Sequence, residues 1–126
     1  MQSNSANRVV LVGHLGKEPE FRHTANDKVV ANFSLATTVR SKNDKGEFVD
    51  NTDWHRVVVW GNLAEYVKTL LKGQMVYVEG RITYRDYVDK ENIKRYVTEI
   101  WADTITILGG RKKAEAGSEA ADETPF

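Results

Sequence analysis

The stretch Thr-Asp-Trp-His-Arg-Val-Val-Val-Trp-Gly at residues 52–61 constrains the fold more than any other part of the chain. It is dominated by β-branched and aromatic residues, which favour a β-strand. Side chains alternate along a strand, so two faces result: Trp54, Arg56, Val58 and Trp60 on one, and His55, Val57 and Val59 on the other. The first face is compatible with the core of a small barrel and with an exposed platform, although a cation is seldom fully buried without a partner.

Apolar patterns predict four further long strands around this one. They cover residues 7–15, 29–39, 75–88 and 94–108, with a short extended segment at residues 20–23. The first is nearly continuous in apolar residues, so we expect both of its faces to be covered. Residues 40–51 are polar and include Lys42 and Lys45, which is typical of a mobile loop. Gly13 and Gly80, inside predicted strands, indicate bends or bulges.

One helix is predicted, over residues 62–72. Its apolar residues recur at helical spacing and form a single stripe: Leu63, Tyr66, Val67, Leu70 and Leu71. Asn62 and Glu65 have the spacing of a capping box, and Gly73 is placed to end the helix.

The order of these elements predicts an all-β fold with one helix. A single helix between the third and fourth of five strands is the arrangement of the oligonucleotide/oligosaccharide-binding (OB) fold, a five-stranded barrel. The turn at residues 89–92 joins two long strands in a β-hairpin that extends beyond such a barrel. Residues 111–126 are small, charged and without pattern, so we expect an OB-fold domain at residues 1–110 and a disordered C-terminal tail at residues 111–126.

Composition excludes several classes of protein. The chain contains no cysteine, which removes disulfide frameworks and thiolate metal sites and favours an intracellular setting. Its first residues are polar and no apolar run approaches the length of a membrane helix, about 20 residues, so we expect neither a signal peptide nor a membrane partner. Residues 1–113 carry a net charge of +4 and residues 114–126 a net charge of −4. This asymmetry fits an anionic partner whose surface the tail competes for, and equally a solubilising tail.

An aromatic and basic surface is the strongest functional candidate. It is formed by two sets of side chains from the predicted strands: Trp54, Trp60 and Tyr87, and Arg56, Arg81 and Arg85. Aromatic rings stack on any base for about 1–3 kcal/mol per base, and arginines contact phosphates. The set has the residue types that single-stranded nucleic acid bound without sequence preference requires. The competing interpretation, that both tryptophans belong to the core of a small barrel, stays open, although Arg56 on the same face argues against full burial.

No catalytic site, metal site or cofactor is predicted. His55 beside Asp53 could act as a general base or metal ligand, but no serine or cysteine nucleophile lies near it in sequence. His14 and His23 lack the spacing of zinc ligands, and no glycine-rich phosphate loop is present. A hydrogen-bonded structural histidine at an interface is the favoured role for His55.

The last five residues have the composition of a short linear ligand. Asp122 and Glu123 suit basic residues of a partner protein, and Pro125 and Phe126 suit an apolar pocket.

Motifs throughout residues 7–110 carry a resemblance to a known family. They are Asn-Arg-Val-Val-Leu-Val-Gly-His-Leu-Gly at 7–16, Pro-Glu-Phe-Arg at 19–22, Leu-Ala-Thr at 35–37, Thr-Asp-Trp-His-Arg-Val-Val at 52–58, Leu-Ala-Glu at 63–65, Lys-Gly at 72–73, Val-Tyr-Val-Glu-Gly at 76–80, Arg-Tyr-Val-Thr-Glu-Ile at 95–100 and Leu-Gly-Gly at 108–110. With these motifs in register, the chain resembles the bacterial-type single-stranded DNA-binding protein family. The resemblance implies a homotetramer that wraps single-stranded DNA at the bacterial nucleoid in the cytoplasm, during replication, recombination and repair. It also implies that replication and repair proteins are recruited through the C-terminal tip.

Residues of this sequence match functional positions of that family. Trp54 matches its stacking tryptophan, and Trp60 and Tyr87 match aromatic positions. His55 matches a subunit-interface position, and we expect Tyr77 to join it. The basic pattern and the resemblance together give the expected phosphate contacts Arg8, Arg22, Arg40, Arg56, Lys72, Arg81 and Arg85. The expected partner-binding tip consists of Asp122, Glu123, Pro125 and Phe126.

The sequence also departs from the family. No tryptophan follows residues 35–37, where Arg40 brings only charge, and the linker is reduced to residues 111–121. Thr124 stands in the tip where an aliphatic residue is common, and Trp101 stands where a small aliphatic residue is expected. Two alternatives remain: a dimeric, primosome-type relative that mainly contacts replication proteins, and a small hydrolase or metal enzyme around His55.

Overall fold

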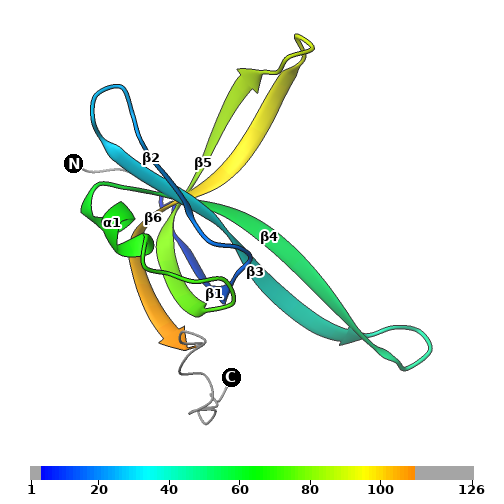
Figure 1. Ribbon diagram of the computed structural model, residues 1–126. Coiled ribbons are helices and arrows are strands. Elements are labelled where there is room, and N and C mark those ends of the chain that lie inside the picture. The colour runs from blue at the N-terminus through cyan, green and yellow to red at the C-terminus, as the bar shows by residue number, and fades with distance from the viewer. Residues whose placement is uncertain (1–3, 110–126) are drawn as a thin grey trace.

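The computed structural model describes residues 4–109 (Figure 1). Its elements are, in chain order, β1 (Val9–Leu15), β2 (Glu20–His23), β3 (Val29–Lys42), β4 (Phe48–Trp60), α1 (Asn62–Val67), β5 (Met75–Val88) and β6 (Lys94–Gly109). The predicted order of strands around one helix is confirmed, and the short segment at residues 20–23 forms a strand, β2. The predicted tail, with its tip residues Asp122, Glu123, Pro125 and Phe126, lies outside the described residues.

The strands close into the predicted five-stranded barrel. Most of β1 pairs with β5, while its last residues, His14 and Leu15, pair with β3. The sheet continues from β5 through β6 and β4 to β3, which completes the ring, and β2 lies outside it on β3. Gly13 permits the crossing of β1 over β3, because a Cβ there would lie 2.2 Å from the backbone oxygen of Ala36.

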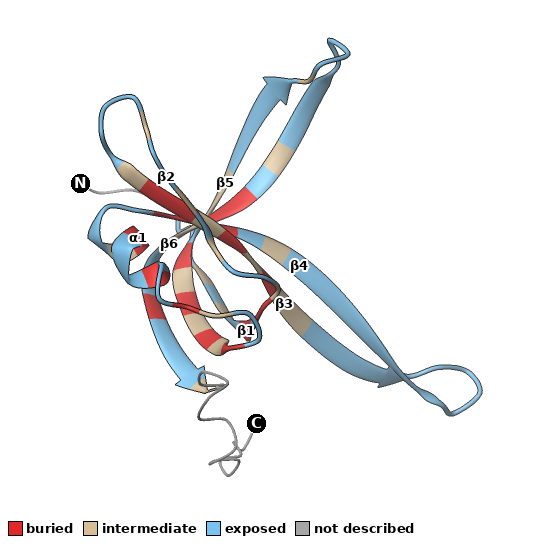
Figure 2. Ribbon diagram, in the orientation of Figure 1, coloured by how far each residue is buried: buried red, intermediate tan, exposed pale blue. Residues whose placement is uncertain are grey.

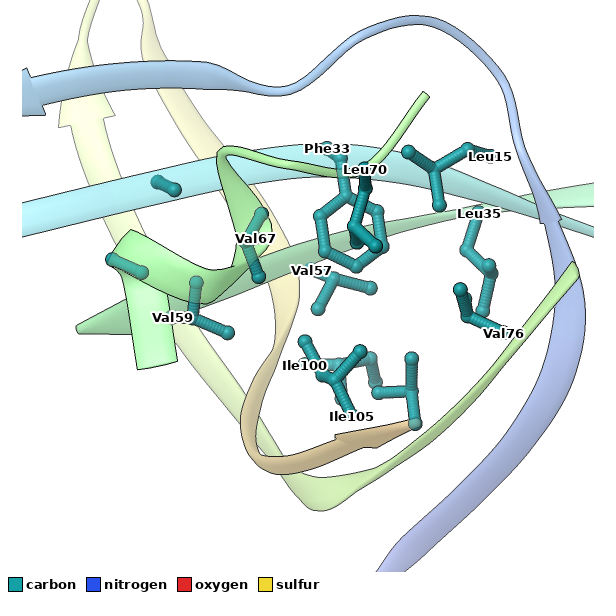
Figure 3. Close-up of a cluster of buried hydrophobic side chains, with 13 residues drawn as sticks. Leu15, Phe33, Leu35, Val57, Val59, Val67, Leu70, Val76, Ile100 and Ile105 are labelled. Atoms are coloured by element: carbon teal, nitrogen blue, oxygen red, sulfur yellow. The ribbon is translucent and has the colours of Figure 1, made fainter. Parts of the chain in front are cut away.

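The apolar core lies inside this barrel (Figure 3). Val57 and Val59, on one face of β4, are fully buried in the same cluster as Phe33 of β3. On the opposite face of β4, Trp54 is 61% exposed and Trp60 is 40% exposed. The predicted alternation is confirmed, and it places both tryptophans on a surface and not in the core.

Two hairpin arms extend beyond the barrel (Figures 1 and 2). In the β3–β4 arm the strands stay paired as far as Lys42 opposite Phe48, and in the β5–β6 arm they stay paired to the end of β5. The ends of both arms are exposed, whereas the same strands carry buried residues where they cross the barrel. β5 changes register between Glu79 and Gly80, which confirms the irregularity predicted at Gly80.

Two predictions about strands need correction. The predicted loop at residues 40–51 is too long: β3 continues to Lys42 and β4 begins at Phe48, so only residues 43–47 form a turn. A projecting ribbon meets solvent on both faces, so its polar composition imitates that of a loop. Within the single chain β1 is covered on its inner face only, because Val10 and Val12 are 57% and 42% exposed on its outer side.

Helix α1 is shorter than predicted and ends at Val67. Beyond it the chain continues in tight turns, in which the N–H of Leu70 donates to the carbonyl oxygen of Val67 over 3.0 Å, and Gly73 follows with φ +88°. The predicted capping box is also wrong: Gly61 is the N-cap, and no side chain caps the helix. α1 packs against β3, β4 and β6. Within residues 4–109, no helix has both the length and the apolar character needed to cross a membrane.

Candidate nucleic-acid interface

One outer face of the barrel and of the β5–β6 arm gathers aromatic and basic side chains. We call it the aromatic–basic face; its members are Arg22, Trp54, Arg56, Trp60, Arg81, Arg85, Tyr87, Glu99 and Trp101. The strand register explains how they meet, because Arg81 of β5 lies opposite Trp101 of β6, and β4 runs parallel to β6 on the other side. Val58, on the outer face of β4, pairs with Trp101. Segments far apart in sequence thereby form one surface.

Three open hollows follow one another along this face, and Arg56 lines all of them. They lie beside Trp54, between Trp60 and Trp101, and between Arg85 and Tyr87. Arg22 lines the middle hollow together with Arg56. An arginine is therefore present at each hollow that an exposed ring borders, which suits a ligand that alternates flat rings with anionic groups.

The indole of Trp54 rests on a glycine. A Cβ at Gly16 would lie 2.4 Å from Cζ3 of the Trp54 ring, so the backbone at Gly16 supports that part of the indole. Despite this contact, Trp54 remains 61% exposed. A ring that is supported by the backbone and still open to solvent is suited to stacking, because little ordering remains to be done on binding.

Glu99 ties the centre of the face together. Its side chain is only 3% exposed, and its Oε2 accepts hydrogen bonds from Arg56 Nε at 3.0 Å and from Arg85 Nη2 at 2.9 Å. Its Oε1 accepts a hydrogen bond from Trp101 Nε1 at 3.1 Å. Arg56 and Arg85 remain 46% and 50% exposed, so each guanidinium is anchored at one side and open at the other.

Electrostatics keep this carboxylate ionised. Burial alone would raise the pKa of Glu99, but hydrogen bonds from Arg85, Trp101 and Arg56 outweigh it and hold the pKa below its usual value. The hydrogen bond to Glu99 in turn raises the pKa of Arg85. Two cations share one buried anion, so the cluster keeps a net positive charge at neutral pH.

Trp60 and Trp101 form an indole pair beside this cluster. Their ring centroids are 5.9 Å apart, and the ring planes are tilted by 55°. The guanidinium of Arg81 lies over the Trp101 ring, 5.2 Å from its centroid. An exposed cation–π contact of this kind contributes about 0.5–1 kcal/mol.

Three of the predicted phosphate contacts lie away from the aromatic–basic face. Arg8 forms ion pairs with Glu79 at its Nη2 and with Asp103 at its Nη1, the second at 3.0 Å, and these bonds raise its pKa. Lys72 is exposed after α1. Arg40 lies on the β3–β4 arm, where its Nε contacts Asp50 Oδ1 at 3.0 Å. The roles of all three on DNA stay predictions.

The two predicted interface residues make hydrogen bonds within the chain. His55 is half-buried, and its Nε2 lies 2.9 Å from Thr37 Oγ1. Tyr77 donates its hydroxyl to Glu79 Oε1 over 3.2 Å, which raises the pKa of Tyr77. Their role between subunits stays a prediction. Within the described part of the chain, no group of three or more His, Cys, Asp or Glu side chains could hold a metal ion.

Three residues of interest were missed from the sequence. Glu99 and Trp101 carried no recognised role, because their meeting with Arg56 depends on the pairing of β4 with β6. Phe48 lies in the segment predicted as a loop. It is six residues before Trp54, so on a continuous strand the two side chains share one face, and this spacing could have identified it. Its ring is 64% exposed, and Lys42 Nζ lies over it, 5.4 Å from the centroid.

Comparisons with known proteins agree with this architecture. The model of the single-strand binding protein family matches residues 6–108. The chain is 42% identical over 117 residues to the single-stranded DNA-binding protein 1 of Chlorobaculum tepidum, covering 91% of this chain and 72% of that protein. It is 40% identical over 115 residues to a single-stranded DNA-binding protein of Neisseria meningitidis, covering 90% of this chain and 66% of that protein.

A solved structure shares the fold. The Plasmodium falciparum SSB, in its complex with ssDNA, superposes with a TM-score of 0.74 at 32% identity, over 86% of this chain and 100% of that chain. The family model spans nearly all of the described residues, whose strands close into a barrel. This chain therefore belongs to the single-strand binding protein family.

Proposed function

We propose that this chain binds and protects single-stranded DNA without sequence preference, during replication, recombination and repair, and that it does so without catalysis or a cofactor. The observation that carries the proposal is the continuity of the aromatic–basic face, in which Arg56 lines the hollows beside Trp54, Trp60 and Tyr87. Membership of the family and the named relatives support the same conclusion. Binding to DNA also accounts for the expected location at the bacterial nucleoid.

The face offers separate contacts for bases and phosphates. Trp54 and Trp60 are six residues apart on β4, which is about 20 Å along a strand, so they receive different nucleotides. Each stacked base contributes about 1–3 kcal/mol regardless of its identity. Arg56 lies between the two rings in sequence and, with Arg22, Arg81 and Arg85, supplies the charge for phosphates.

Stacking on side chains requires bases that are not already stacked on each other. Double-stranded DNA presents its phosphates but keeps its bases inside the helix, so it can use the arginines of the face and not the rings. The proposal therefore predicts a strong preference for single strands.

The β3–β4 arm extends the aromatic–basic face beyond the barrel. Phe48 lies on the face of β4 that also carries Trp54, about 20 Å further out, and it is flanked by Lys42 and Arg40. We propose that this exposed ring and its two cations contact a longer strand. The arm would then serve in place of the tryptophan that family members often carry after residues 35–37.

The decisive experiment compares labelled oligo(dT) with a duplex of equal length by fluorescence anisotropy. Trp54→Ala and Tyr87→Ala should each weaken oligo(dT) binding by about 1–3 kcal/mol. Tyr96→Ala is the matched control, because Tyr96 is 75% exposed on the same arm as Tyr87 but pairs with Asp86, on the opposite face. Equal affinity of the native chain for the duplex and the single strand would refute the proposal.

We also propose that the chain assembles as a homotetramer. The outer side of β1 exposes Val10 and Val12, and Tyr77 of β5 lies opposite Val12. Exposed aliphatic residues on an outer sheet surface favour self-association. His55 has the same parity on β4 as the buried Val57 but is only half-buried. We propose that its accessible part contacts a neighbouring subunit, in addition to its bond to Thr37.

Recruitment of replication and repair proteins is proposed for the C-terminal tip, which lies outside the described residues. Its basis is chemical: Asp122 and Glu123 suit basic residues of a partner, while Pro125 and Phe126 suit an apolar pocket. When no partner protein is bound to the tip, the acidic tail would compete with DNA for the basic body of the protein.

A further inference from the structure

Trp101 is held in a defined orientation at the centre of the aromatic–basic face. Its Nε1 donates to Glu99 Oε1 over 3.1 Å, its ring lies 5.9 Å from that of Trp60, and the Arg81 guanidinium lies over it at 5.2 Å. The ring is half-buried, so part of it faces the hollow that Trp60 and Arg56 also line. No role for this indole follows from the contacts assigned above.

Trp101 is not a core side chain. The residue before it, Ile100, is buried in the core cluster, and strand alternation turns Trp101 to the opposite side of β6. Its register partners are Arg81 on β5 and Val58 on β4. Arg81 belongs to the aromatic–basic face, and Val58 is on the same side of β4 as Arg56 and Trp60. The indole therefore adds an aromatic surface to the place where cations already gather.

Glu99 explains why the indole is held there. Its Oε2 is shared by Arg56 and Arg85, while its Oε1 receives the Trp101 N–H. A carboxylate that is 3% exposed needs these donors, so the two guanidinium groups and the indole are fixed together. One buried side chain thus sets the relative positions of a ring and two phosphate-binding groups.

We infer that Trp101 is a further base-stacking side chain, paired with Trp60, and that Glu99 is the positioning residue that holds it beside Arg56 and Arg85. The inference rests on the proposed function and names a contact within it. On binding, a base takes the place of the Arg81 guanidinium on the Trp101 ring, and Arg81 turns to the phosphate. The exchange is favourable because a stacked base contributes more than the exposed cation–π contact that it replaces.

The direct test uses the fluorescence of Trp101 alone. The chain has three tryptophans, so the double variant Trp54→Phe, Trp60→Phe leaves Trp101 as the single indole while it keeps two aromatic rings for stacking. Binding of labelled oligo(dT) is followed by anisotropy of the label, and the Trp101 emission is recorded in the same titration. We expect the emission to be quenched in parallel with binding. Unchanged emission at full binding would overturn the inference and leave the proposed function intact, whereas failure of the native chain to bind oligo(dT) would refute the proposed function.

A second set of variants measures the ring and its hydrogen bond separately in the native background. Trp101→Phe removes the N–H and keeps a ring, whereas Trp101→Ala removes both. We expect Trp101→Ala to weaken oligo(dT) binding by roughly 5- to 150-fold, and Trp101→Phe by much less. Equal losses in the two variants would show that the ring plane makes no contact and would overturn the inference. Thermal unfolding confirms that both variants are folded at the binding temperature.

The positioning role of Glu99 has its own readout. In the single-tryptophan chain, Glu99→Gln should lower the steady-state emission anisotropy of Trp101 without DNA, because the indole loses its ionic acceptor. It should also reduce the extent of quenching by saturating oligo(dT). A purely structural role would lower the unfolding temperature and leave both optical signals of the folded protein unchanged, and that result would overturn the assignment of Glu99.

Discussion

The Trp54 indole lies so close to Gly16 that a Cβ at residue 16 would be 2.4 Å from ring atom Cζ3. Gly16 follows β1 and Trp54 lies in β4, so the contact forms only when the barrel closes. The glycine is therefore part of the support for a ring that we assign to stacking.

Gly16→Ala should displace the Trp54 ring. Because Trp54 is 61% exposed, the ring can move at small cost in stability, but it leaves the orientation suited to a base. We expect oligo(dT) binding to weaken by up to the value of one stacking contact, about 1–3 kcal/mol, measured by anisotropy. Gly109→Ala is the control, since a Cβ there meets nothing within 4 Å. In a Trp54→Ala background, Gly16→Ala should have no further effect; an additive loss would disprove the coupling.

Glu99 should make the stability of the fold sensitive to acid. Its pKa is lowered in the folded chain, so its contribution to the free energy of unfolding is complete above the unfolded value near 4.5 and is lost as pH falls through the lowered pKa. Urea unfolding between pH 7 and strongly acid pH measures this slope. Glu99→Gln should lower stability at pH 7 by roughly 1–3 kcal/mol and should flatten the acid limb. An identical acid limb in both chains would contradict the prediction.

Phe48→Ala should weaken binding to oligo(dT) long enough to reach the β3–β4 arm, by about 1–3 kcal/mol, and should leave binding to short oligomers unchanged. The reason is that Phe48 lies near the end of the arm, far from Trp60. Val49→Ala is the matched control, because Val49 is 41% exposed on the same strand but has the opposite parity. Equal effects on long and short oligomers would argue against a contact on the arm.

The native chain should have about four times the 14.3 kDa chain mass in light scattering. Val12→Lys places a charge on the exposed side of β1 and should reduce that mass, whereas Val88→Lys, on an arm, should not. His55→Ala should also weaken assembly, while DNA binding per chain stays unchanged and neither the variant nor the native chain hydrolyses its substrate candidates. A native mass of twice 14.3 kDa would instead favour the dimeric, primosome-type alternative.

Deletion of residues 122–126 should abolish capture of replication and repair proteins and leave DNA binding unchanged or slightly tighter. The reason is that it removes acidic side chains that compete with phosphates for the basic body. Pull-down and oligo(dT) titration at low and moderate salt measure the two effects, and the competition should fade as salt rises. Weaker DNA binding after the deletion would refute the competition.

The sequence predicted that Trp54, Arg56 and Trp60 share one side of a strand, because alternation requires only local geometry. It left open whether that side is core or surface; the burial of Val57 and Val59 in the structure decided it. The same local reasoning failed for residues 40–51, because a paired ribbon exposed on both faces has no apolar side to reveal it.

Tertiary structure alone decided the chemistry at the centre of the face. Arg56 is 43 residues and Arg85 is 14 residues from Glu99, and they meet at one carboxylate oxygen because β6 pairs with both β4 and β5. Trp101 departs from the family pattern in sequence, but its bond to Glu99 and its pairing with Trp60 follow from that closure. A sequence specifies which side of a strand a residue occupies; only the register between distant strands specifies what it touches.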